Sequence, residues 1–155
     1  MIAFSIGMFV DCFIDNKTIN FLDINKLDKT YYNIYMLPII TEIRDRNHFL
    51  ELLYSNPGVF IIKFGADWCS PCKLIEEDVK KFMNVMPDTV QCAIINVDEC
   101  VDVYSYLKNK RMINGIPAIM VYYKGNVKQF PDDMVVGADI TKIAALFNRA
   151  YKKAV

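Results

Sequence analysis

The sequence lacks the charge imbalance of a protein that binds nucleic acid or an anionic membrane surface. Its 155 residues include 18 lysines and arginines and 18 aspartates and glutamates, so the formal net charge is +0. It also lacks any apolar run of about 18 residues, the length that a membrane-spanning helix needs. We therefore expect neither nucleic acid nor a membrane as a partner.

Histidine is nearly absent, which weighs against a metal site. His48 is the only histidine, and there is a single C-x-x-C pair, Cys69 and Cys72. Structural zinc usually needs four ligands, supplied by two such pairs or by one pair with histidines. The sequence therefore predicts no metal and no other cofactor.

Cysteine is too sparse for the disulfide framework of a small secreted protein. The five cysteines are an odd number, and a chain of this length can build a core without disulfides. The apolar run from Ile2 to Val10 lacks the positive flank and the cleavage site of a signal peptide, and Asp11 follows it. These features predict an intracellular, cytoplasmic protein with reduced cysteines and one reactive pair.

Apolar residues are abundant, and their patterns predict alternating helices and strands from residue 37 onward. Hydrophobic residues make up 54% of the chain and charged residues 23%, as in globular domains. The order of the elements predicts an α/β fold whose central mixed sheet is flanked by helices. The expected elements are a helix from a Thr41 cap to 54, a strand at 59–64, a helix from 69–71 to about 86, a strand at 90–97, a helix at 99–109, a hairpin of 118–123 with 127–130, and a helix at 140–152.

The segment WCSPCK places the cysteine pair where a strand gives way to a helix. Unpaired amides at a helix start favour a negative charge, so a thiolate at Cys69 is stabilised. Pro71 suits the first turn, where its missing N–H costs nothing. One turn brings Cys72 beneath Cys69, which favours redox chemistry over zinc binding or a purely structural bridge. In that chemistry Cys69 attacks a target disulfide and Cys72 resolves the mixed disulfide.

The longer segment FGADWCSPCK resembles the active-site signature of the thioredoxin family. Other parts of the family pattern follow in order: Asn96-Val97-Asp98 at the end of the central strand, Ile116-Pro117 at the cis-proline, and Val136-Gly137-Ala138 at the late glycine loop. The resemblance spans about residues 38–152 and implies the thioredoxin fold for a domain at residues 37–155.

The resemblance also implies roles for individual residues. Cys69 corresponds to the exposed nucleophile and Cys72 to the resolving thiol. A cis Pro117 allows the backbone of Ile116 to bind an extended substrate segment as an added strand. A docking surface for target proteins is implied at Trp68, Ser70, Pro71, Val97, Gly115, Ile116, Gly137 and Ala138.

By resemblance, the chain is expected to be a thiol-disulfide oxidoreductase that reduces protein disulfides and is recharged by a thioredoxin-reductase-type electron donor. Two alternatives stay open. One is an oxidase or isomerase of the same fold that forms disulfides, and the other is a non-catalytic adaptor that only binds. Both cysteines and the proline are present, which disfavours the adaptor.

Two residues near the cysteines depart from the family pattern. Ser70 stands where glycine is usual, which is expected to shift the reduction potential. Lys63 stands where the family carries a buried aspartate, and a charged lysine cannot act as that base. One hypothesis is that Lys63 stabilises the Cys72 thiolate and makes the protein more oxidising. The alternative is that Lys63 points along the sheet edge and pairs with a carboxylate such as Glu76.

Residues 1–36 have no counterpart in the minimal fold and are predicted to be an N-terminal extension with two short strands. The extension adds strands to the sheet, mediates a homodimer, or folds over the docking surface; the sequence leaves these roles open. Two cysteines outside the pair have other expected places: Cys92 in the core and Cys100 at a helix start.

Overall fold

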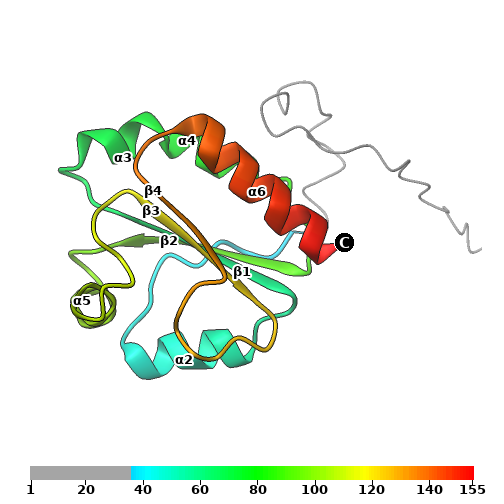
Figure 1. Ribbon diagram of the computed structural model, residues 1–155, viewed down its shortest axis with the longest axis horizontal. Coiled ribbons are helices and arrows are strands. Elements are labelled where there is room, and N and C mark those ends of the chain that lie inside the picture. The colour runs from blue at the N-terminus through cyan, green and yellow to red at the C-terminus, as the bar shows by residue number, and fades with distance from the viewer. Residues whose placement is uncertain (1–35) are drawn as a thin grey trace, which may run out of the picture.

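The computed structural model describes residues 36–155 (Figure 1). The strands predicted within residues 1–36, and a dimer contact through that extension, lie outside the described residues. No helix within the described part has both the length and the apolar composition needed to cross a membrane.

Four strands form one mixed sheet in the order β2-β1-β3-β4. The central strand β1 (Val59–Gly65) runs parallel to β2 (Val90–Asn96) and antiparallel to β3 (Ala118–Tyr123). The edge strand β4 (Asp133–Val136) pairs antiparallel with β3. The predicted α/β fold with a central mixed sheet is therefore confirmed.

Helices cover both faces of the sheet because successive side chains of a strand point to opposite faces. Phe60, Ile62 and Phe64 belong to a buried cluster that also contains core residues of α2 and α5. Val59 and Ile61 belong to a second cluster, shared with α4 and α6. Figure 1 shows α4 and α6 on one side of the sheet and α2 and α5 on the other. The helices are α2 (Arg46–Tyr54), α3 (Ser70–Leu74), α4 (Glu76–Met83), α5 (Val101–Asn109) and α6 (Ile140–Ala154).

The first described helix, α2, begins later than the sequence predicted. Its N-cap is Asp45, whose side chain accepts a hydrogen bond from the backbone N–H of His48 at 2.8 Å. The prediction that Thr41 caps this helix is wrong, because the carboxylate of Asp45 satisfies an amide of the first turn and Thr41 lies before it.

Replacing Asp45 with alanine is expected to lower the free energy of unfolding by about 1 kcal/mol, because an amide of the first turn of α2 loses its acceptor. Urea denaturation of the full chain measures this change. Thr41→Ala is the matched control and should leave the stability within about 0.5 kcal/mol of the wild type. Equal losses in both variants would contradict the assignment of the cap.

The single helix predicted from 69–71 to about 86 is two helices. Ile75 separates α3 from α4, because its N–H bonds to the carbonyl of Lys73 instead of continuing the regular ladder. Three acidic residues, 76 to 78, occupy the first turn of α4, where the helix dipole favours negative charge. The prediction also placed the helix end too late, since α4 ends at Met83.

The second strand of the predicted hairpin lies at Asp133–Val136, so its prediction at 127–130 is wrong. Hydrogen bonds of side chains hold the intervening loop, where the hydrogen bonds of a strand pair were expected. The Asp132 carboxylate accepts from the N–H of Tyr123 at 2.7 Å and from the side-chain amide of Asn126 at 2.9 Å. The hydroxyl of Tyr122 donates to the carbonyl of Gln129 at 2.9 Å. The loop therefore carries the chain to a later pairing with β3.

Candidate active site

The cysteine pair lies directly after the central strand, at the start of α3. Cys69 is the N-cap of α3 and Cys72 lies in its first turn, and the two form a disulfide with their Cα atoms 5.3 Å apart. The backbone N–H of Cys72 donates to Cys69 Sγ at 3.3 Å. The predicted strand-to-helix junction is therefore confirmed, and an amide points at the sulfur where it was expected.

Neither sulfur of the pair is widely exposed. Cys69 is 5% exposed and Cys72 is 3% exposed, so the expectation of an exposed Cys69 is wrong for the disulfide form. The bond to Cys72 covers one side of the Cys69 sulfur, and the rest packs in a buried cluster. Ser70 and Pro71, between the cysteines, are exposed.

The peptide bond between Ile116 and Pro117 is cis, as predicted, and Pro117 is buried. Ile116 packs against the buried cluster that contains both cysteines of the pair. The N–H of Gly137 donates to the carbonyl of Pro117 at 2.8 Å, which ties the late glycine loop to the proline. Within residues 36–155, the backbone N–H and C=O of Ile116 have no hydrogen-bond partner.

The residues predicted for the docking surface differ in exposure. Trp68 is 68% exposed, and its ring N–H donates to the Asp98 carboxylate at 2.9 Å. Val97 is buried at 5% and offers no accessible side chain there. The predicted positions beside the cis-proline and in the late glycine loop are half-buried: Gly115, Ile116, Gly137 and Ala138.

The sequence interpretation missed Val136 and Met134, which are 39% and 38% exposed on the edge strand β4. A methyl group placed on Gly115 would lie 3.9 Å from Val136, so the two positions adjoin. The strand period could have identified them, because Met134 and Val136 alternate along β4 before Gly137. The misplaced strand at 127–130 hid this signal.

Lys63 is the only buried charged side chain among the described residues, at 4% exposure. It lies in β1, the strand flanked by β2 and β3, so it is not at an edge of the sheet. Glu76 instead forms its ion pair with Lys80, at 2.7 Å. The sheet-edge part of the alternative interpretation of Lys63 is therefore wrong, and its link to Glu76 is a Coulombic interaction without an ion pair.

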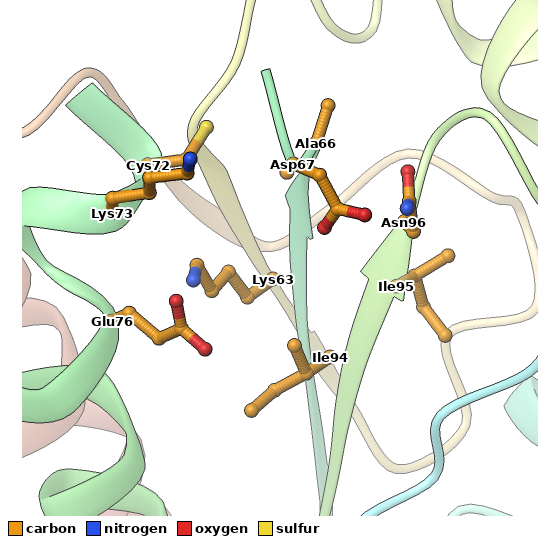
Figure 2. A pocket seen from close by; sticks show the side chains of 10 residues that line it. Lys63, Ala66, Asp67, Cys72, Lys73, Glu76, Ile94, Ile95 and Asn96 are labelled. Carbon is orange, nitrogen blue, oxygen red and sulfur yellow. The ribbon is translucent and has the colours of Figure 1, made fainter. Parts of the chain in front are cut away.

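The Lys63 side chain reaches from β1 toward α3 and α4, between Cys72 and Glu76 (Figure 2). A methyl group placed on Gly65 would lie 3.5 Å from Cys72 Sγ and 3.8 Å from Lys63 Cε. The lysine side chain and the sulfur therefore border the same space beside Gly65. A cavity of about 100 Å³ opens there. Its lining comprises Lys63, Gly65, Ala66, Asp67, Cys72, Lys73, Glu76, Ile94, Ile95 and Asn96.

Burial lowers the pKa of Lys63, because desolvation penalises its charged form. The Glu76 carboxylate opposes this shift, and the Lys80 ammonium adds to it. The Lys63 side chain therefore lines the same cavity as Cys72 and forms no ion pair of its own within the described residues.

The two free cysteines of the described chain are buried. Burial raises the pKa of Cys92 to about 12 and that of Cys100 to about 11. The Cys100 thiol donates to the carbonyl of Ile43 at 3.1 Å. Both residues occupy the places expected from the sequence, in the core and before α5, and neither forms a thiolate near neutral pH.

Comparison with known proteins agrees with the fold and with the cysteine pair. The family model described as thioredoxin matches residues 39–148. A thioredoxin of Mycoplasma pneumoniae is 37% identical over 90 residues, which are 58% of this chain and 82% of that protein. A thioredoxin of Mycoplasma genitalium is 32% identical over 111 residues, covering 71% of this chain and 99% of that protein.

A solved structure of a thioredoxin from Trichomonas vaginalis superposes with a TM-score of 0.62. It is 22% identical and covers 72% of this chain and 96% of its own. At that identity the likeness bears on the fold alone, which in this chain is a four-stranded mixed sheet flanked by helices.

Proposed function

Since the chain belongs to the thioredoxin family, a family of thiol-disulfide oxidoreductases, we propose that it reduces disulfides of protein substrates with Cys69 as the nucleophile and Cys72 as the resolving thiol. The observation that carries this proposal is the amide of Cys72, which points at Cys69 Sγ from 3.3 Å. In the dithiol form the same amide stabilises a thiolate at Cys69, and the thiolate is the reactive species.

The exchange proceeds in two displacements. The Cys69 thiolate attacks one sulfur of the substrate disulfide, forms a mixed disulfide and releases the other substrate sulfur as a thiolate. Cys72, as a thiolate, then attacks Cys69 Sγ, which re-forms the Cys69–Cys72 disulfide and releases the second substrate sulfur. Two electrons pass to the substrate, and an electron donor of the thioredoxin-reductase type returns the pair to the dithiol form.

Substrate proteins dock beside Trp68, where the exposed ring stands next to the cysteine pair. The unpartnered N–H and C=O of Ile116 support the binding of an extended substrate segment through backbone hydrogen bonds. Val136 and Met134 extend this docking surface along β4. Cys92 and Cys100 are free thiols, which fits a reducing compartment such as the cytoplasm.

Replacing Cys72 with serine tests the assigned roles, because it removes the resolving step but leaves the attack intact. The reduced full-length variant, mixed with insulin as a disulfide substrate, is expected to accumulate a covalent adduct through Cys69. Peptide mapping by mass spectrometry identifies the linked cysteine. The matched control is Cys69→Ser with Cys72→Ser, which should give no adduct in this segment.

An adduct of the Cys72→Ser chain at Cys92 or Cys100, or no adduct at all, would contradict the assignment. Adduct formation at Cys69 in the single variant and its loss in the double variant would support the two displacements as written.

A further inference from the structure

We propose that Lys63 holds Cys72 as a thiolate whenever the Cys69–Cys72 disulfide is open, so that the resolving sulfur and the buried ammonium form a charge pair. This inference rests on the proposed function, because it concerns the second displacement of that reaction. Lys63 acts on the sulfur of Cys72 and does not contact the substrate.

The position of Lys63 supports the pair. Strand alternation places Lys63 on the same face of β1 as Val59 and Ile61, toward α4. Its Cε and the Cys72 sulfur both lie within 4 Å of the point where a Gly65 side chain would begin. Because Gly65 has no side chain, none of its own atoms fills the space that the lysine and the sulfur border.

The other charged groups around Lys63 nearly balance one another. Asp67 and Glu76 contribute negative charge and Lys73 contributes positive charge to the lining of the cavity, and β2 contributes Ile94, Ile95 and the uncharged Asn96. Lys80, on α4, is bonded to Glu76 at 2.7 Å and offsets its charge. Lys63 therefore stands among charges that largely offset one another, between Cys72 and Glu76 (Figure 2).

Opening the disulfide gives this ammonium a partner that it otherwise lacks. In the disulfide form Cys72 carries no charge, and the buried side chain of Lys63 has no ion pair or hydrogen bond within the described residues, only a Coulombic interaction with Glu76. When the disulfide opens, the proton of the Cys72 thiol leaves through the polar cavity, and the resulting thiolate faces the ammonium. When the disulfide forms again, the sulfur lone pair enters the new S–S bond and the charge pair disappears.

The charge pair has a consequence for the direction of electron flow. An interaction present only in the open state favours the dithiol over the disulfide, which makes the protein a weaker reductant than it is without the lysine. It also speeds the second displacement at neutral pH, because a larger fraction of Cys72 is already the thiolate.

A titration of Cys72 tests the inference directly. Two full-length proteins are compared, one with Lys63 and one with Lys63→Met. Both carry Cys69→Ser, and both carry Cys12→Ser, which removes the fifth cysteine of the chain. Thiolate formation is followed by ultraviolet absorbance, to which Cys92 and Cys100 add little below pH about 10. The midpoint for Cys72 is expected about one to two pH units lower with Lys63 than with methionine.

Two further variants distinguish the buried charge of Lys63 from the overall charge of α4 and from side-chain polarity. Lys81→Met removes one exposed positive charge from α4, whose ion pair with Asp78 spans 3.8 Å, and should leave the midpoint nearly unchanged. Lys63→Gln repeats the loss of charge with a polar side chain and should match Lys63→Met. Equal midpoints for Lys63, Lys63→Met and Lys63→Gln would overturn the inference.

Equilibration with glutathione at pH 8 gives a second readout in chains that keep both active-site cysteines. If the lysine lowers the thiol pKa from about 9 to about 7, the dithiol form becomes about tenfold less favoured in Lys63→Met, or about 30 mV more negative in potential. An unchanged equilibrium would also overturn the inference.

The two proposals can fail separately. Adduct formation by Cys72→Ser does not depend on Lys63, so a normal adduct with an unshifted titration would reject the charge pair alone. A shifted titration without any adduct would reject the assigned displacements and leave the charge pair standing.

Discussion

Replacing Cys69 with serine is expected to lower the rate of protein-disulfide reduction by at least about a thousandfold, because the first displacement loses its thiolate. A serine hydroxyl at the same N-cap still accepts the amide of Cys72, which now donates to the sulfur from 3.3 Å, so α3 is expected to stay folded. Reduction of insulin, with dithiothreitol or glutathione as the electron source, measures the rate. More than a few per cent of residual activity in Cys69→Ser would contradict the mechanism.

Cys92→Ser and Cys100→Ser are the matched controls, since each removes one sulfur from the chain outside the active site. Both thiols are buried and their pKa values are raised to about 12 and about 11, so neither supplies a thiolate. Each control should retain most of the activity while losing some stability, because a hydroxyl replaces a buried sulfur. A loss of activity comparable to that of Cys69→Ser would show that a second cysteine takes part.

The sequence was most informative where local pattern and chemistry coincide. Apart from Lys63, the strand at Val59–Gly65 is an apolar run, which is typical of a strand buried on both faces, and the cysteine pair with Pro71 marks the helix that follows. The cis bond before Pro117 came from family resemblance, since an isolated Ile-Pro dipeptide does not fix its isomer.

The errors lie where long-range contacts decide the structure. The 127–130 segment is rich enough in apolar residues to suggest a strand, but it lies in a loop in which the Tyr122 hydroxyl donates to Gln129 and the Asp132 carboxylate accepts from Tyr123. Val97 was placed on the docking surface by its position in the motif, yet it packs in the core. Neither the hydrogen bonds of this loop nor the burial of Val97 produces a pattern in the neighbouring residues, so hydrophobic periodicity alone could not predict them.

Lys63 shows the opposite relation between local pattern and structure. An apolar strand with one lysine in its middle contradicts the hydrophobic pattern, and such contradictions tend to mark functional positions. The sequence alone left the lysine either buried or at a sheet edge. The pairing of β1 with both β2 and β3 places it in the interior of the sheet, where burial disfavours a charge.

Lys63→Met is expected to raise the free energy of unfolding of the disulfide form by about 1–3 kcal/mol at pH 7, because a buried charge without a bonded counter-ion is replaced by an apolar side chain of similar length. Lys63 is 4% exposed, and the anion nearest to it in α4 is already paired with Lys80. Urea denaturation of the oxidised full chain measures the change. A loss of stability in the variant would show that the ammonium is better satisfied than its surroundings indicate.

The pH dependence of that gain separates the charge of Lys63 from its packing. Burial lowers the pKa of Lys63 in the folded chain, so the unfolded chain binds more protons between this lowered pKa and the ordinary value of about 10.4, and wild-type stability rises with pH across that window. The gain from Lys63→Met should therefore be largest below the lowered pKa and shrink as the pH approaches about 10.4. Lys81→Met, at an exposed lysine of α4, should show no such trend. If the rise in the free energy of unfolding of Lys63→Met stays constant with pH, it comes from packing and not from charge. If it shrinks with pH, the buried charge of Lys63 lowers the stability of the protein, and the lysine that acts on Cys72 is retained at a cost in stability.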